Sequence, residues 1–216
     1  MNSDSNIKVR PQTLKEKFKE ATNDSILLGA ERIFAQQGLH AARMEDIAAD
    51  AGVSVGTLYN HFEDRESLLS SLVEARQIEF LIRLDQRSRK LESDSFDHQL
   101  EGFISAVLEH FHIHRPFFTI LMEGEHARDC KTFPISLSKP RLTMEQLCRR
   151  VEALVQRGLQ SGALRPEDSE IYPTMLMGML KGILVRSLFA EDVAEPTAKR
   201  VGQMVRFFTS GAGTSK

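Results

Sequence analysis

Apolar residues recur with helical spacing along almost the whole chain. Ile26, Ala30 and Phe34 follow one another at every fourth position, which places them on one face of an α-helix. Comparable spacing covers residues 64–90, 97–114, 116–128, 139–161, 168–191 and 196–209, with Gly, Pro or polar residues between segments. No run alternates apolar and polar residues as a half-buried strand does. The sequence therefore predicts an all-α fold of about nine helices.

The segment after Gly38 has the pattern of two short helices joined by a tight turn. The first is predicted over residues 44–51, and Ser54 can cap a second that runs to about residue 61. The helix before them begins either after the capping residues 23–25 or earlier, near Thr13. A helix-turn-helix needs small and apolar residues where its helices touch and a Gly in its turn. The residues that meet these needs are Ile47, Ala48, Gly52, Val53, Leu58 and Phe62.

The string GLHAARMEDIAADAGVSVGTLYNHFEDRESLL, residues 38–69, resembles the helix-turn-helix of the TetR/AcrR family of bacterial transcriptional regulators. The likeness covers residues 23–70. It implies a ligand-responsive DNA-binding regulator, most simply a homodimeric repressor that a small apolar or amphipathic effector releases from a pseudo-palindromic operator. An activator or a co-repressor-dependent regulator of the same fold stays open as an alternative, and so does a helical adaptor that binds only protein.

The second short helix of such a motif enters the major groove with its N-terminal end leading. Its hydroxyl, amide and imidazole groups offer hydrogen bonds to phosphates and base edges. Arg43 and Val55 depart from the family pattern, which usually has a Thr cap and a polar residue there. The predicted DNA-contacting residues are Arg43, Met44, Ser54, Val55, Gly56, Thr57, Tyr59, Asn60, His61 and Arg65.

The charge balance argues for weak non-specific DNA binding. The 216-residue chain has a formal net charge of −2, and residues 23–65 hold three basic and seven acidic side chains. Residues 1–22 are different, with five basic and three acidic side chains. This basic arm either follows a phosphate backbone or is a solvated tail, and part of it extends the first helix if that helix begins near Thr13.

The rest of the chain is predicted to form an effector-binding and dimerisation domain. The predicted boundaries are an arm over residues 1–22, a DNA-binding domain over 23–65, this domain over 66–210 and a tail over 211–216. Its middle helices are rich in Phe and Met, residues that suit adaptable pockets, although an ordinary packed core has the same composition. The effector-pocket candidates are Phe103, Val107, Phe111, Phe117, Phe118, Leu121, Met122, Met144, Leu147 and Cys148.

The last two helices are the predicted dimer interface. Gly178 and Gly182 are four residues apart, a spacing that permits close helix approach between subunits or, alternatively, inside one subunit. A four-helix interface built from both subunits is the expected arrangement. Its candidate residues are Met175, Gly178, Met179, Gly182, Ile183, Val201, Met204, Val205 and Phe208.

His110 and His114 lie one helical turn apart and make half of a metal site that Glu123 and His126 would complete. Alternatively, the histidines are amphipathic surface or pocket-rim residues; this second interpretation is favoured, so neither a metal nor another cofactor is predicted. No GxSxG, HExxH or Walker-type string is present, and no enzyme is predicted. Cys130 and Cys148 are expected as free thiols. Without a long apolar run or a signal-like N-terminus, a cytoplasmic location is expected.

Overall fold

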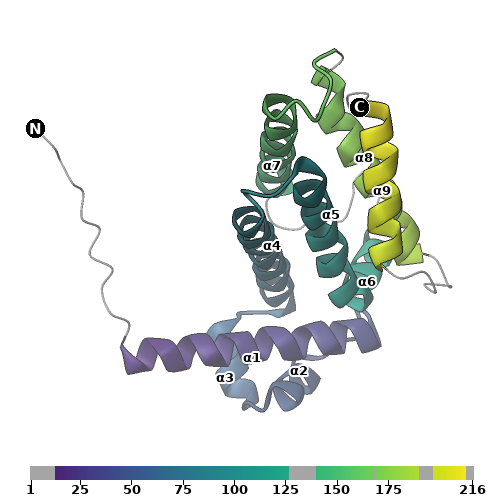
Figure 1. Ribbon diagram of the computed structural model, residues 1–216. Helices are drawn as coiled ribbons and strands as arrows, with labels where there is room; N and C mark the ends of the chain where they lie inside the picture. The colour runs from purple at the N-terminus through teal and green to yellow at the C-terminus, as the bar shows by residue number, and fades with distance from the viewer. Residues whose placement is uncertain (1–12, 127–139, 168, 190–196, 213–216) are drawn as a thin grey trace, which may run out of the picture. The chain divides into compact units, whose positions relative to one another are not determined.

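The computed structural model describes residues 13–126, 140–167, 169–189 and 197–212, and within these it shows nine α-helices and one short 3₁₀-helix (Figure 1). This confirms the predicted all-α fold. Residue contacts divide the chain into a first part, residues 1–69, and a second part, residues 70–216. Residues 1–12 of the predicted arm, residues 213–216 of the tail and Cys130 lie outside the described residues, as do the side chains of Met122, Glu123 and His126.

The first helix of the first part, α1 (Leu14–Gln37), begins at the earlier of the two starts that the sequence left open. Thr13 caps it, because its side chain accepts the Glu16 N–H at 3.3 Å and its own N–H donates to the Glu16 carboxylate at 2.7 Å. The helix ends at Gly38, whose φ of 83° favours glycine.

Helices α2 (Met44–Ala51) and α3 (Val55–His61) form the predicted helix-turn-helix. Gly52 makes the turn in the left-handed conformation, with φ 71°. Ile47, Ala48 and Leu58 are at most 1% exposed, so they form the contact between the two helices and α1. Phe62 is also buried, whereas Val53 is half-buried.

Helix α1 packs closely on α2 at Gly29. A Cβ placed on Gly29 would lie only 3.1 Å from the Cβ and backbone nitrogen of Ala51. Ser25 Oγ donates to the Ala51 carbonyl at 3.0 Å, which satisfies one of the carbonyls that a helix end leaves open. Arg32 Nη2 and Asp50 Oδ2 form a largely exposed ion pair at 2.6 Å, a kind of pair that contributes little to stability.

The second part contains the later turns of α4 (Arg65–Lys90), then α5 (Phe96–Ile113), α6 (Arg115–His126), α7 (Pro140–Gln160), the 3₁₀-helix Ser169–Ile171, α8 (Tyr172–Phe189) and α9 (Thr197–Ala212). Helix α5 is central, because it contacts α6, α7, α8 and α9 (Figure 1). Its fully buried residues, Leu100 and Ile104, share one core with Leu84, Leu154 and Leu176. The helix bounds lie close to those predicted, except that α8 begins four residues later, after the 3₁₀ turn.

Charged side chains join α4 to its neighbours α5 and α7. Arg150 donates to both carboxylate oxygens of Asp85 at 2.8 Å, and these hydrogen bonds hold the pKa of Asp85 below its usual range. Arg87 Nη2 lies 3.2 Å from Glu109 Oε2 on α5. These partly exposed contacts tie α4 to both neighbouring helices.

Candidate functional site

Helix α3 presents most of its side chains to solvent. Tyr59 is 48% exposed, and Val55, Gly56 and Asn60 are exposed as well. Leu58 on the opposite side is fully buried, so it anchors the helix while its neighbours point outward. The result is a short helix with a fixed position in the first part and an open polar surface.

The beginning of α3 is held by hydroxyl groups. Ser54 Oγ accepts the Thr57 N–H at 3.1 Å and lies 2.8 Å from Thr57 Oγ1. A Cβ on Gly56 would meet only Ser54 Oγ, at 3.9 Å, so the backbone here is open to a close partner. His61, in the last turn, is half-buried.

Three predicted DNA-contacting residues flank these helices in different ways. Arg43 is exposed at the N-cap of α2 and makes no side-chain capping bond. Arg65 Nη1 donates to the His40 carbonyl at 2.6 Å, so part of its guanidinium holds the loop after α1. Met44 is only 7% exposed, because its side chain faces the core as its helical spacing predicts, and little of its surface is left to contact DNA.

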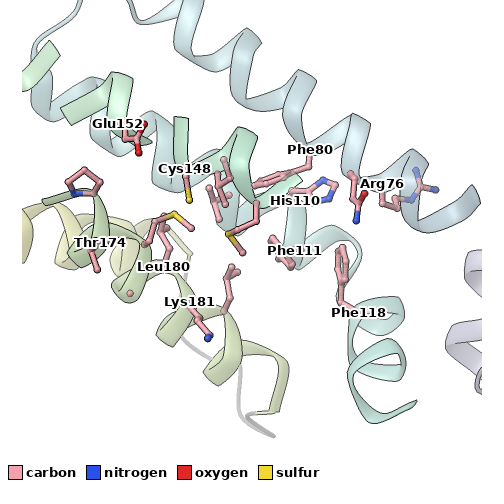
Figure 2. Close-up of a pocket in the computed structure, with 18 of the residues that line it drawn as sticks. Arg76, Phe80, His110, Phe111, Phe118, Cys148, Glu152, Thr174, Leu180 and Lys181 are labelled. Atoms are coloured by element: carbon pink, nitrogen blue, oxygen red, sulfur yellow. The ribbon is translucent and has the colours of Figure 1, made fainter. Parts of the chain in front are cut away.

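A cavity of about 490 Å³ lies in the second part, a size usual for small-molecule sites (Figure 2). Helices α4, α5, α6, α7 and α8 all contribute to its wall. Phe111 and Phe118 face each other with ring centroids 4.6 Å apart, and Phe80 lies 5.8 Å from Phe111. The lining residues are Val73, Arg76, Gln77, Phe80, Val107, His110, Phe111, Phe118, Met144, Leu147, Cys148, Glu152, Pro173, Thr174, Met177, Gly178, Leu180, Lys181 and Leu184.

The cavity includes part of the predicted pocket set and adds residues that the sequence analysis missed. The predicted residues that line it are Val107, Phe111, Phe118, Met144, Leu147 and Cys148. Phe103, Phe117 and Leu121 are buried but do not line it. The missed residues come mainly from α4 and α8. On α4 their signal is the spacing of Val73, Gln77 and Phe80, which lie on one face of the helix.

Two buried histidines lie beside an acidic residue at this cavity. His110 is 1% and His114 is 7% exposed, and their ring centroids are 4.9 Å apart. His114 Nε2 lies 3.5 Å from Glu79 Oε2. Glu79 thus occupies the place beside the histidines for which the sequence analysis considered Glu123 and His126.

Burial acts in opposite directions on the pKa values of His110 and Glu79, because it disfavours the charged form of each side chain. Burial, reinforced by the positive charge of His114, lowers the pKa of His110 to about 4, so its imidazole is neutral at neutral pH. Burial alone would raise the pKa of Glu79. The charge of His114 and the contacts with Arg83 and Arg76 outweigh it and hold that pKa below its usual range.

The predicted dimer residues divide between surface and core. Met175 is exposed, and a Cβ on Gly178 or Gly182 would meet no described atom within 4 Å, so packing inside the described chain does not explain these glycines. Met179, Ile183 and Val205 are half-buried. Val201, Met204 and Phe208 are at most 4% exposed, because α9 buries them in the core of its own chain, and they leave little surface for a second copy. The neighbouring Phe207, which the analysis missed, is 70% exposed.

Comparison of this chain with known proteins agrees with the helix-turn-helix geometry of the first part. The family model of the tetR family of bacterial regulatory proteins matches residues 26–72. The HTH-type transcriptional regulator UidR of Escherichia coli (strain K12) is 27% identical over 176 residues, which cover 81% of this chain and 85% of UidR. Among the described residues, no helix is long and apolar enough to cross a bilayer.

Solved structures share the fold at low sequence identity. A TetR-family regulator of Mesorhizobium loti superposes with a TM-score of 0.73 at 17% identity, covering 94% of this chain and 100% of that one. The regulator FadR of Bacillus subtilis, solved in complex with stearoyl-CoA, gives a TM-score of 0.65 at 20% identity over 87% of this chain and 98% of FadR. The helix-turn-helix of this chain therefore matches the tetR family of bacterial regulatory proteins, and the chain shares its fold with solved regulators of that family.

Proposed function

We propose that this protein is a homodimeric repressor that binds a pseudo-palindromic operator and leaves it when an amphipathic effector enters the second part of the chain. The observation that carries the proposal is the pairing, in one chain, of an exposed α3 anchored by Leu58 with a largely apolar cavity of about 490 Å³. Each feature alone is common. Together they provide one site for duplex DNA and one for a small molecule.

The operator-contacting surface is the exposed side of α3 with its flanks. Ser54, Thr57 and Tyr59 supply hydroxyl groups, and Asn60 supplies an amide, the groups that read base edges and bind phosphates. Val55 is 37% exposed and suits contact with a thymine methyl group. Arg43 adds a cation at the edge of this surface.

A dimer is needed because one helix-turn-helix covers only half of such an operator. The exposed apolar residues Met175 and Phe207, with half-buried Met179, line one surface depression at α8 and α9. Gly182 leaves room beside it for a helix of a second copy, whereas Gly178 also lines the cavity. This revised set supports an interface in which α8 contributes more than the buried stripe of α9.

The effector is an amphipathic molecule with a long apolar portion. Most of the cavity wall is Val, Leu, Met and Phe, which favours an apolar chain or ring system. Arg76, Glu152 and Lys181 also line it and can contact a polar head group (Figure 2). The stearoyl-CoA held by the similarly folded FadR supports a long acyl compound as the class to test first.

Helix α4 is the element that can couple the two sites. It begins at Arg65, which belongs to the first part, and it carries Gln77 and Phe80 of the cavity wall. Coupling requires that effector and operator favour different conformations of the protein. Displacement of α4 by the effector would change the spacing of the two α3 helices in the dimer.

Replacement of Tyr59 by alanine tests the operator surface. We expect roughly tenfold weaker binding to DNA from upstream of the protein's own gene, as is usual when one base or phosphate contact is lost. Electrophoretic mobility shift measures it. Ile82→Ala, which removes an equally exposed side chain from α4, should bind like the wild type. Equal binding by both variants would contradict the assignment of α3.

Filling the cavity tests the effector site. Stearic acid and stearoyl-CoA are expected to lower operator affinity in a fluorescence anisotropy titration. Cys148→Trp should weaken that response about tenfold or more, because the indole occupies the space of an acyl chain. Cys148→Ser keeps the volume and should respond normally. Tighter operator binding with either compound would instead favour a co-repressor, and an unaltered affinity with both would exclude long acyl compounds.

A further inference from the structure

Glu79, His110 and His114 form a compact group of metal-ligating side chains in the second part of the chain. Each offers one ligand atom, and these atoms all lie within 4.8 Å of one another. His110 and His114 lie one turn apart at the end of α5, while Glu79 comes from the neighbouring α4. Glu79 precedes the two histidines by 31 and 35 positions in the sequence, and the fold brings the three side chains together.

His110 is buried with a polar nitrogen that no described residue satisfies. The residue is only 1% exposed, and its Nδ1 has no hydrogen-bond partner among the described residues. A buried polar nitrogen without a partner is costly and uncommon in folded proteins. His110 also lines the cavity, between Phe80 and Arg76 (Figure 2). A ligand at this place would meet an imidazole nitrogen.

We propose that Glu79, His110 and His114 bind a divalent transition-metal ion, of which Zn²⁺ is the type. Two imidazoles and one carboxylate are a ligand set that zinc uses when a coordination position stays open. Because His110 lines the cavity, the open position faces it. If the proposed effector function also holds, a donor atom of the effector can complete the coordination, but metal binding itself does not depend on that function.

Two arginines compete with the ion for Glu79. Arg76 Nη1 lies 2.8 Å from Glu79 Oε2, and Arg83 Nη2 lies 3.2 Å from Glu79 Oε1. A bound cation must share the carboxylate with these guanidinium groups, which repel it. This makes a specific consequence testable: removal of Arg83 should strengthen metal binding, whereas removal of the Glu79 charge should weaken it. The Arg83 side chain is 33% exposed, so its replacement leaves the core intact.

The test titrates Co²⁺, a spectroscopic substitute for Zn²⁺, into the untagged full chain after treatment with EDTA. We expect visible d–d absorption that saturates at one ion per chain and is abolished by competing Zn²⁺. Glu79→Gln and His110→Phe should each lower Co²⁺ affinity about tenfold or more, since even residues that only support a metal ligand change affinity by 10–100-fold. Arg83→Gln should raise it several-fold. His112→Gln, an exposed histidine between the two ligands, should leave it unchanged.

Absence of Co²⁺ binding would overturn the proposal. So would binding that Glu79→Gln and Arg83→Gln leave unchanged, because the ion would then lie elsewhere. Circular dichroism shows whether each variant is folded. If His110→Phe is not folded, the opposite effects expected for Glu79→Gln and Arg83→Gln decide the question by themselves, because these side chains are 35% and 33% exposed. No operator DNA or effector enters the experiment, so its outcome is separate from that of the proposed function.

Discussion

Replacing Leu58 with alanine is expected to unfold most of the first part of the chain at moderate temperature. Leu58 is fully buried at the contact between α3 and the helices beneath it. Truncation of a fully buried leucine costs roughly 2–5 kcal/mol, the amount depending on how far the site collapses. A region of about 70 residues lies at the low end of the 5–15 kcal/mol by which domains are stable. Urea unfolding followed by circular dichroism measures the loss.

The neighbouring residue provides the control for this experiment. Tyr59→Ala removes a larger side chain from the same helix, but one that is 48% exposed. It should change the free energy of unfolding by no more than about 0.5 kcal/mol, as surface substitutions usually do. Leu58→Ala should therefore lower the stability of the protein, whereas Tyr59→Ala should weaken operator binding and leave the stability nearly unchanged. A Leu58→Ala protein as stable as the wild type would contradict the packing described for the helix-turn-helix.

Acidification is expected to destabilise the second part through His110. The imidazole has a pKa of about 4 when folded and about 6.5 when unfolded, so the unfolded state binds the extra proton between these values. Stability therefore falls as the pH drops through 6.5 and levels off for this group near pH 4. The total loss from this group is about 3 kcal/mol. Burial is the main cause of this low pKa; His114, Arg83 and Arg76 lower the pKa further, and Glu79 opposes them.

The contribution of His110 is measured as a difference between two proteins. Unfolding of the wild type and of His110→Phe is followed at several pH values in the presence of EDTA, so that metal binding plays no part. Phenylalanine keeps an aromatic ring beside Phe80, whose centroid lies 5.1 Å from that of His110. The stability of the variant should fall less than that of the wild type between pH 6.5 and 4. Parallel curves would show that His110 is not buried as a neutral group.

The helix-turn-helix is the region that the sequence predicted most closely. Gly52, Ala48 and Leu58 lie near one another in the chain, and turn geometry relates them directly. The N-cap Ser54 and the start of α3 follow from the same local rules. The helical spacing of Met44 with Ile47 and Ala48 likewise predicts an inward-facing side chain, and Met44 is buried.

The cavity was less predictable because it depends on how distant helices pack. Phe103 and Phe111 are two turns apart on α5, yet only Phe111 reaches the cavity, whereas Phe103 lies in the core. Periodicity identifies an apolar face but not what that face meets. Glu79 is a similar case, since nothing near it in the sequence indicates that it meets two histidines of another helix. The apolar stripe of α9 that includes Val201 likewise packs within its own subunit.

The long first helix has a consequence for how its beginning behaves. Residues 14–21 of α1 are exposed, and the first fully buried side chain is that of Ile26. The capping box at Thr13 and the internal hydrogen bonds of the helix are therefore what keep these turns in place, with no core behind them. Local opening there costs close to nothing compared with unfolding of the rest. This end can fray and re-form while the helix-turn-helix stays folded. The start of α1 can therefore lose its helical structure without unfolding of the domain to which it belongs.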